Sequence, residues 1–256
     1  MGGHLMQRML AVGFALVAYI LFFASFLWLI AFIGDVGIFP TTINDAVNGT
    51  PVVQAIAVDL LLIALFGVQH SVMARPWFKA RLTRIVSTSV ERSIYVLAAA
   101  AALAIMLRYW HTLGGTIWDV REGAGEPLIW AVFAIGWAVV LLSTFLINHF
   151  ELFGLSQAWH HGRVREDRPP QLREPLFYRY VRHPLYLGFL LAFWATPHLT
   201  ISHLLFAAGM TAYIFIGIAH EERDLLAHFG SAYDDYRKRV GMIVPGLGRR
   251  RDRPDD

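Results

Sequence analysis

Arg182-His183-Pro184-Leu185-Tyr186-Leu187-Gly188 is the stretch around which the chain is organised. It follows a basic, proline-dotted segment and opens an apolar run, and the next apolar run ends at Glu221-Glu222. If the two runs are membrane helices joined as a hairpin, the Arg-His-Pro corner and the carboxylate pair meet at one membrane face. That arrangement suits a polar cofactor held at the edge of a bilayer.

The composition indicates a membrane protein. The 256 residues are 56% hydrophobic and only 16% charged, whereas soluble domains carry about 25% charged residues. No cysteine is present, which excludes disulfides and thiolate metal sites. The basic residues behind the net charge of +3 gather in loops, as expected at one membrane face, so nucleic acid is not a predicted partner.

Apolar runs predict an all-α integral membrane protein with five or six transmembrane helices. The run from Met9 to Ile33 is too long for a signal-peptide core and is interpreted as a retained membrane helix. Further spans are predicted at 52–73, 92–110, 127–149 and 201–219. Residues 185–196 form a short apolar helix that leaves the count at five or six.

The distribution of basic residues predicts the orientation. All of the 22 Lys and Arg except Arg108 and Arg121 fall on one side when the 75–92 loop, the 151–182 connection and both termini are placed together. The positive-inside rule makes that side cytoplasmic, and a bacterial inner membrane is the expected location. After the last span, apolar residues at helical spacing between 225 and 240 predict an amphipathic helix on the cytoplasmic surface. The Arg249–Arg253 tail is expected to be disordered and to contact membrane lipid.

Polar side chains at the cytoplasmic ends of the predicted spans form the candidate catalytic set. Eight of them, from five spans, fall at one depth, which indicates a lined cavity rather than ordinary interfacial residues; they are His70, Glu91, Arg92, Tyr95, Asn148, His149, His183 and Glu221. Within this set, the candidates for catalysis are His70, Glu91, Tyr95 and His149. Asp59, inside the second span, serves either a function or a polar contact between helices.

The histidines allow other interpretations. The chain has 11 of them, but no H-E-x-x-H motif or evenly spaced ligand set, so no metal site is predicted. Paired histidines on facing helices are also the ligands of haem in some helical bundles. His70 and His149 are the pair on which such a site would depend.

Two separated motifs resemble a known family. The run from Tyr178 to Gly188, followed by Glu221-Glu222-x-x-Leu225 and Phe229-Gly230, resembles the membrane methyltransferases related to isoprenylcysteine carboxyl methyltransferase. That likeness covers about residues 150–246. Gln69-His70-Ser71, with Glu91-Arg92-Ser93-x-Tyr95, is similar to the NnrU-like branch of these proteins.

The resemblance implies a methyltransferase whose cofactor is S-adenosylmethionine. Carried over by motif, the residues that would line its pocket are Gln157, Gln171, Leu172, Tyr178, His183, Tyr186 and Glu221. The expected organisation is a single membrane domain over 1–256. Within it, 1–150 form a four-helix bundle, 151–246 form the methyltransferase core and 247–256 form a basic tail.

One departure from the family pattern points to the substrate. In the prenylcysteine enzymes an arginine four residues before the first Glu of the pair holds the substrate carboxylate, and here that position is Gly217. A buried carboxylate without a partner is costly, so a small neutral thiol is the predicted substrate.

Methyl transfer to sulfur needs thiolate character. A base is therefore required, and the sequence leaves open whether it is His70, His149 or Glu91. Two alternatives remain: a methyltransferase with a lipidic acceptor, and a non-enzymatic, redox-associated membrane protein of the NnrU kind.

Overall fold

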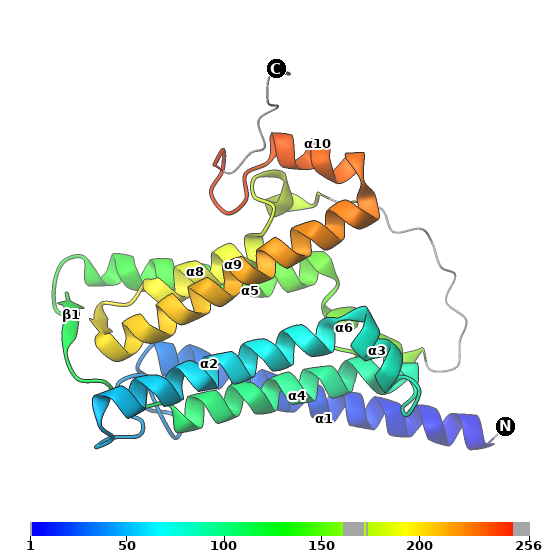
Figure 1. Cartoon of the computed structure of the whole chain (residues 1–256), viewed down its shortest axis with the longest axis horizontal. Coiled ribbons are helices and arrows are strands. Elements are labelled where there is room, and N and C mark those ends of the chain that lie inside the picture. The colour runs from blue at the N-terminus through cyan, green and yellow to red at the C-terminus, as the bar shows by residue number, and fades with distance from the viewer. Residues whose placement is uncertain (1, 161–171, 173, 248–256) are drawn as a thin grey trace. The chain divides into compact units, whose positions relative to one another are not determined.

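The computed structural model describes residues 2–160, 172 and 174–247 (Figure 1). The chain divides into two compact units. The first unit comprises Met1–Asp119, Asn148–Glu166 and His198–Gly209. The second unit comprises Val120–Ile147, Asp167–Pro197 and Met210–Asp256. The expectation of one membrane domain with a boundary near residue 150 stays a prediction.

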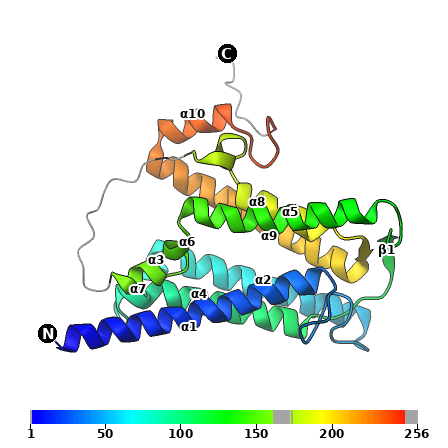
Figure 2. The same cartoon turned by 180° about the vertical axis from the view of Figure 1, so that it is seen from behind.

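The first unit is built on three long helices. They are α1 (Gly2–Ile33), α2 (Val52–Ala74) and α4 (Thr88–Tyr109). Helices α1 and α2 both pack on α4, and the two opposite views show the three side by side (Figures 1 and 2). Small buried side chains of α1 and α4, including Ala18 and Ala100, allow close approach. The short helix α3 (Pro76–Leu82) joins α2 to α4.

Two short helices and a strand pair complete the first unit. Helices α6 (His149–Leu152) and α7 (Leu155–Trp159) are separated by Gly154, whose φ of +86° favours glycine. Strands β1 (Thr116–Asp119) and β2 (His198–Thr200) pair antiparallel. No strand was predicted from the sequence, so the strands are a finding of the structure.

The second unit depends on a close crossing of α5 (Glu126–Ile147) and α8 (Pro184–Trp194). A Cβ on Gly188 would lie 2.7 Å from the carbonyl oxygen of Gly136, and a Cβ on Gly136 would lie 2.8 Å from that of Gly188. The two helices therefore touch backbone to backbone, which only glycine permits. The unit also contains the 3₁₀ helix η1 (Leu176–Arg179).

Helix α9 (Ile201–Phe229) is longer than predicted. The expected end at Ala219 was wrong, because the helix continues past the carboxylate pair to Phe229. Gly230, with φ +55°, separates it from α10 (Ser231–Arg239). The apolar residues expected to form one surface helix are thus divided between two helices. Tyr233, Tyr236 and Val240 pack together in a buried cluster, and a position on the membrane surface stays a prediction.

In the part of the chain that the structure describes, five helices are long and apolar enough to cross a membrane, namely α1, α2, α4, α5 and α9, whereas α8 is a shorter apolar helix. This confirms the predicted fold class. The predicted span limits were also close, with the exceptions of the start of α1, which lies at Gly2 rather than Met9, and the end of α9, because hydrophobic runs report helices of this length directly.

Candidate active site

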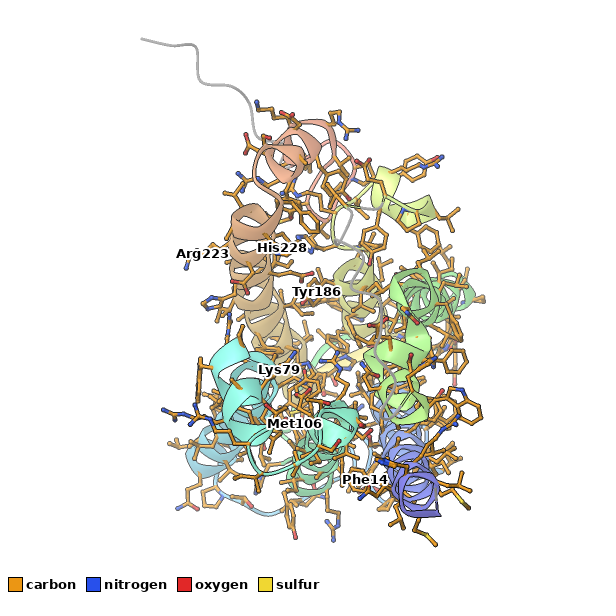
Figure 3. The ribbon with its side chains drawn as sticks, turned by 90° about the vertical axis from the view of Figure 1, so that its right-hand side faces the viewer. Phe14, Lys79, Met106, Tyr186, Arg223 and His228 are labelled. Carbon is orange, nitrogen blue, oxygen red and sulfur yellow. The ribbon has the colours of Figure 1, made fainter. Side chains whose placement is uncertain are left out.

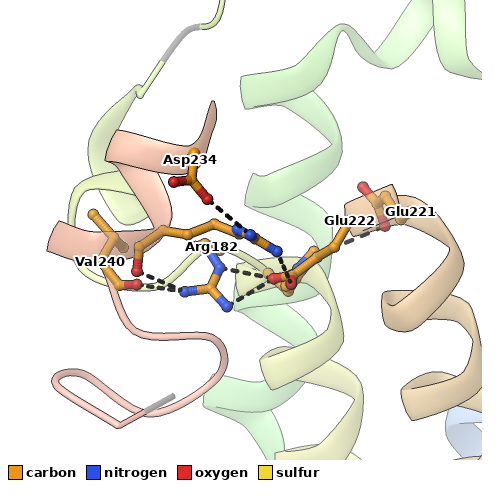
Figure 4. A network of polar contacts seen from close by, with 7 residues as sticks. Arg182, Glu221, Glu222, Asp234 and Val240 are labelled. Carbon is orange, nitrogen blue, oxygen red and sulfur yellow. Dashed lines mark hydrogen bonds and ion pairs between the residues drawn. The ribbon is translucent and has the colours of Figure 1, made fainter. Parts of the chain in front are cut away.

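The second unit holds a buried polar network centred on Arg182 (Figure 4). Its guanidinium donates to Oε1 of Glu222 from Nε at 2.8 Å and contacts the same oxygen from Nη2 at 2.7 Å. Nη1 donates to the backbone carbonyls of Val240 at 2.6 Å and Arg237 at 3.4 Å. The Arg182 side chain is only 2% exposed and that of Glu222 12%. The Arg182–Glu222 network thus joins the helix α8 corner to α9 and to the segment after α10.

Backbone bonds extend the same connection. The amide of Arg182 donates to the carbonyl of Gly241 at 2.8 Å, and the amide of His183 donates to that of Met242 at 3.1 Å. The Tyr236 hydroxyl donates to the carbonyl of Tyr178 at 2.6 Å. Residues near the end of the described chain therefore hold the Arg-His-Pro corner in place.

The two glutamates of the carboxylate pair have different surroundings. Glu222 is committed to Arg182 and lies 3.2 Å from Nε2 of His183. Glu221 is 46% exposed and lies 3.8 Å from Nδ1 of the same ring. Burial and the negative charge of Glu221 raise the pKa of Tyr178 above its usual range, so that phenol stays a neutral hydroxyl. Only Glu221 therefore keeps an accessible carboxylate.

Tyr186 extends the group formed by Tyr178, His183 and Glu221. Its ring centroid is 5.7 Å from that of His183. Its side chain lies on the α9 side of α8, and its hydroxyl would be 3.7 Å from a Cβ on Gly217 (Figure 3). The structure thus brings together four of the predicted cofactor residues in one unit.

The remaining predicted cofactor residues lie elsewhere. Leu172 packs against the cluster of Tyr233, Tyr236 and Val240 in the second unit. Gln157 belongs to the first unit, where its Nε2 donates to the carbonyl of Glu151 at 3.0 Å. Its Oε1 is buried and has no hydrogen-bond partner among the residues that the structure describes. Gln171 lies outside the described residues.

In the first unit, His70 and Tyr95 form a hydrogen-bonded pair. The Tyr95 hydroxyl is 2.8 Å from Nε2 of His70. Nδ1 of His70 is buried and has no hydrogen-bond partner among the described residues. Arg92 lies over the Tyr95 ring at 4.9 Å and donates from Nε to the carbonyl of Leu152 at 2.8 Å. The structure therefore brings two of the predicted catalytic residues into contact.

A second tyrosine–histidine pair lies beside the first. The Tyr19 hydroxyl is 2.9 Å from Nε2 of His149, and the ring of Phe153 lies 4.8 Å from that of His149. Phe153 also packs in a buried cluster with Tyr95. Burial lowers the pKa of His149, so its imidazole is neutral at pH 7. Tyr19 was missed, because a single tyrosine in an apolar run resembles any other lipid-facing or core aromatic residue.

The polar groups at this end of the first unit are incompletely paired. Buried side-chain atoms without hydrogen-bond partners in the structure are Gln69 Oε1, His70 Nδ1, Glu91 Oε1, Ser93 Oγ and Gln157 Oε1. An unpaired buried polar atom costs about 1–3 kcal/mol. Five such atoms, contributed by α2, α4 and α7, are therefore the kind of polar environment that a ligand or water molecules occupy.

Asp59 makes a polar contact rather than joining this set. Its Oδ1 accepts from the backbone amide of His111 at 2.9 Å and lies 3.0 Å from the His111 ring Nδ1. It thus ties α2 to the residues that follow α4. Within residues 2–160, 172 and 174–247, no three His, Asp or Glu side chains are grouped so that they could hold a metal ion.

Comparison with known proteins gives the family. The model of the family described as "NnrU protein" matches residues 60–245, well over half of the chain. Nurim of Xenopus laevis is 30% identical, over 70% of this chain and 65% of its own length. No solved structure matches.

Relatives matched over nearly the full length are enzymes. Methanethiol S-methyltransferase of Mycobacterium tuberculosis is 48% identical over 94% of this chain and 98% of its own length. Methanethiol S-methyltransferase of Crocosphaera subtropica is 41% identical, over 96% and 95%.

Proposed function

The chain belongs to the NnrU family, and from this premise we propose that it methylates methanethiol to dimethyl sulfide. The observation that carries the proposal is 48% identity to a methanethiol S-methyltransferase along 94% of this chain and 98% of that enzyme. The protein is thus an integral membrane thiol S-methyltransferase. Position 217 carries glycine instead of a carboxylate-binding arginine, which agrees with this neutral substrate.

We propose S-adenosylmethionine as the methyl donor. When bound, it supplies a methyl group on a cationic sulfonium. The residues of the second unit fit such a group, because Glu221 offers an accessible carboxylate and Tyr178 keeps a neutral hydroxyl beside it. A carboxylate suits the cationic part of the donor, while tyrosine rings suit its flat, apolar part. His183, held by Glu222, would orient the adjacent residues.

In the first unit, we propose that the polar groups predicted as catalytic remove the thiol proton. Nδ1 of His70 has no partner among the described residues, and it offers a lone pair when Nε2 carries the ring proton and donates to Tyr95. Burial lowers the pKa of His149, so its neutral imidazole is the second candidate. Tyr95 and Tyr19 fix the orientation of these rings through Nε2. Glu91 is the third candidate base.

A variant that lacks the catalytic base should regain activity at high pH. We expect His70→Gln or His149→Gln, whichever removes the base, to lower kcat/KM by about 100-fold or more at pH 7. The deficit should shrink as the pH approaches the pKa of the free thiol, because the substrate then ionises unaided. The measurement is kcat/KM against pH for both variants and for Glu91→Gln. Equal losses for all three variants at every pH would show that none of them acts as the base.

Headspace gas analysis of cells that express the protein tests the proposed activity. Cells fed methanethiol should release dimethyl sulfide, measured by gas chromatography, and cells with the empty vector should not. A purified preparation given a prenylated cysteine should show no turnover. Comparable rates with the two acceptors would replace the small-thiol assignment with a lipidic one.

Gly217 provides a matched pair of variants for the same assay. An alanine at this position makes only ordinary contact with Tyr186, because its Cβ would lie 3.7 Å from the hydroxyl, so Gly217→Ala should keep methanethiol turnover. Gly217→Arg adds a bulky charge beside that hydroxyl and should lower turnover at least tenfold. It should not create activity on prenylated cysteine, since a prenyl chain also needs a long apolar site.

The carboxylate pair should separate binding from folding. We expect Glu221→Gln to weaken binding of S-adenosylhomocysteine by about 10- to 100-fold, the size of a lost charge-assisted hydrogen bond, with little change in stability. Glu222→Gln should instead lower stability and change the affinity little, because Glu222 is buried against Arg182. Calorimetric titration and unfolding measurements on both variants decide the matter. Unchanged affinity in Glu221→Gln would remove that residue from the site.

We propose that both termini and the 75–92 loop are cytoplasmic, on the strength of the basic asymmetry in the sequence. The chain has no cysteine of its own, so single cysteines can be labelled cleanly. Those at Asn48 or Gly123 should react with an impermeant reagent from outside, and one at Arg84 should not; the opposite pattern would reverse the orientation.

A further inference from the structure

The connection between α2 and α4 carries an unusual charge distribution. Lys79, Arg81 and Arg84 lie in or next to α3, and no Asp or Glu occurs anywhere in residues 75–90. None of these three cations has a carboxylate partner among the described residues, and Arg81 and Arg84 are exposed. Clustered like charges repel one another, so an external anion would stabilise this connection.

The same segment exposes large apolar side chains. Trp77 is 52% exposed and Ile85 is 86% exposed. Arg81 follows Trp77 by one helical turn, and its guanidinium lies 5.3 Å from the centre of the indole ring. Tryptophan beside cationic residues is typical of the headgroup region of membranes, where the ring lies at the apolar boundary and the cation reaches phosphate.

A second pair of this kind occurs in the first unit. Arg8 of α1 lies over Trp159 of α7 at 4.6 Å, and Trp159 is more than half exposed. Helix α7 packs on α4. Gly154, just before α7, lies so close to the first turns of α4 that an added Cβ would clash with Ser93. Both opposite views place α3 and α7 at the same end of the first unit (Figures 1 and 2).

We propose that Lys79, Arg81 and Arg84, together with Trp77, form a binding site for the headgroup of an anionic phospholipid. Helix α3 connects two helices that are long and apolar enough to cross a membrane, so lipid headgroups would lie within its reach. Phosphate would pair with the three cations, and Trp77 and Ile85 would enter the boundary of the acyl chains. The site does not depend on the methyltransferase activity.

Native mass spectrometry of the full chain in detergent tests the proposal. Titration with phosphatidylglycerol should yield bound lipid at lower concentration than titration with phosphatidylcholine. Arg81→Gln combined with Arg84→Gln should raise the phosphatidylglycerol concentration required by about 10- to 30-fold, without changing the response to phosphatidylcholine. Both arginines are exposed, so the variant should remain folded.

Arg108 offers a matched control. It lies over Tyr109 at 5.7 Å, an arginine–aromatic pair much like Arg81 and Trp77, but at the opposite end of α4. Arg108→Gln should leave phosphatidylglycerol binding unchanged, whereas Arg81→Gln alone should weaken it. Equal losses in the two single variants, or equal binding of the two lipids by the unaltered chain, would overturn the proposal. Displacement of phosphatidylglycerol by an equal concentration of inorganic phosphate would show a small-anion site instead of a lipid site.

Discussion

Arg182→Ala should lower the free energy of unfolding by about 3–5 kcal/mol, the usual cost of removing one partner of a buried ion pair. Glu222 would remain largely buried with its main partner gone, and the carbonyls of Val240 and Arg237 would lose a donor. Arg182→Lys should recover only part of the loss, because one ammonium cannot reproduce the forked contacts of the guanidinium. Unfolding in mixed detergent, followed by tryptophan fluorescence, measures both variants.

The control for this experiment is another arginine–glutamate pair of the second unit. Arg239 contacts Glu174 at 2.8 Å, nearly the distance in the Arg182–Glu222 network, but the Arg239 side chain is 61% exposed. Because water screens such a pair, Arg239→Ala should cost only about 0–1 kcal/mol. If the two alanine variants lose the same free energy of unfolding, burial does not explain the contribution of the Arg182–Glu222 network to stability.

Gly188→Ala should lower the free energy of unfolding by an amount near the upper end of the range of about 1–3 kcal/mol that is typical of overpacked cores. The added methyl group would lie 2.7 Å from the carbonyl oxygen of Gly136 and 2.8 Å from the amide of Val140. Both are backbone atoms, which cannot rotate away as a side chain does, so α5 and α8 would have to separate. Gly136→Ala should behave alike, because its Cβ would lie 2.7 Å from the amide of Ala192 and 2.8 Å from the carbonyl oxygen of Gly188, both backbone atoms of α8.

Gly13 in α1 is the control for this substitution, because a Cβ there has no neighbour within 4 Å. Gly13→Ala should leave stability unchanged or raise it by about 0.5–1 kcal/mol, since alanine is the better helix former. The same unfolding assay compares the variants. Destabilisation by Gly13→Ala as large as that by Gly188→Ala would contradict the close-crossing explanation.

The sequence predicted the helical architecture because hydrophobic runs of this length have few other structures available. It also predicted that the Arg-His-Pro corner meets the carboxylate pair, and the contacts of Arg182 and His183 with Glu222 confirm that meeting. That meeting follows from the order of apolar and polar runs alone. Such order is enough to bring the ends of neighbouring helices together.

Contacts made by side chains from distant parts of the chain were not predictable. The hydrogen bond between Tyr19 and His149 joins residues 130 positions apart, and neither local periodicity nor charge marks that pairing. The same holds for the Gly136–Gly188 crossing, since any glycine in an apolar helix looks alike in one sequence. The different surroundings of Glu221 and Glu222 also follow from packing rather than from residue type.

The Arg182–Glu222 network is assembled from parts of the chain that are synthesised at different times. Arg182 donates to the carbonyl of Val240, 58 residues further along the chain. At about 5–20 residues per second, the ribosome needs roughly 3–12 s to make the intervening chain. Glu222, the main acceptor of the guanidinium, is made 40 residues after Arg182, so it precedes the Val240 carbonyl. The Nη1 group of Arg182 must therefore stay hydrated until translation has passed residue 240.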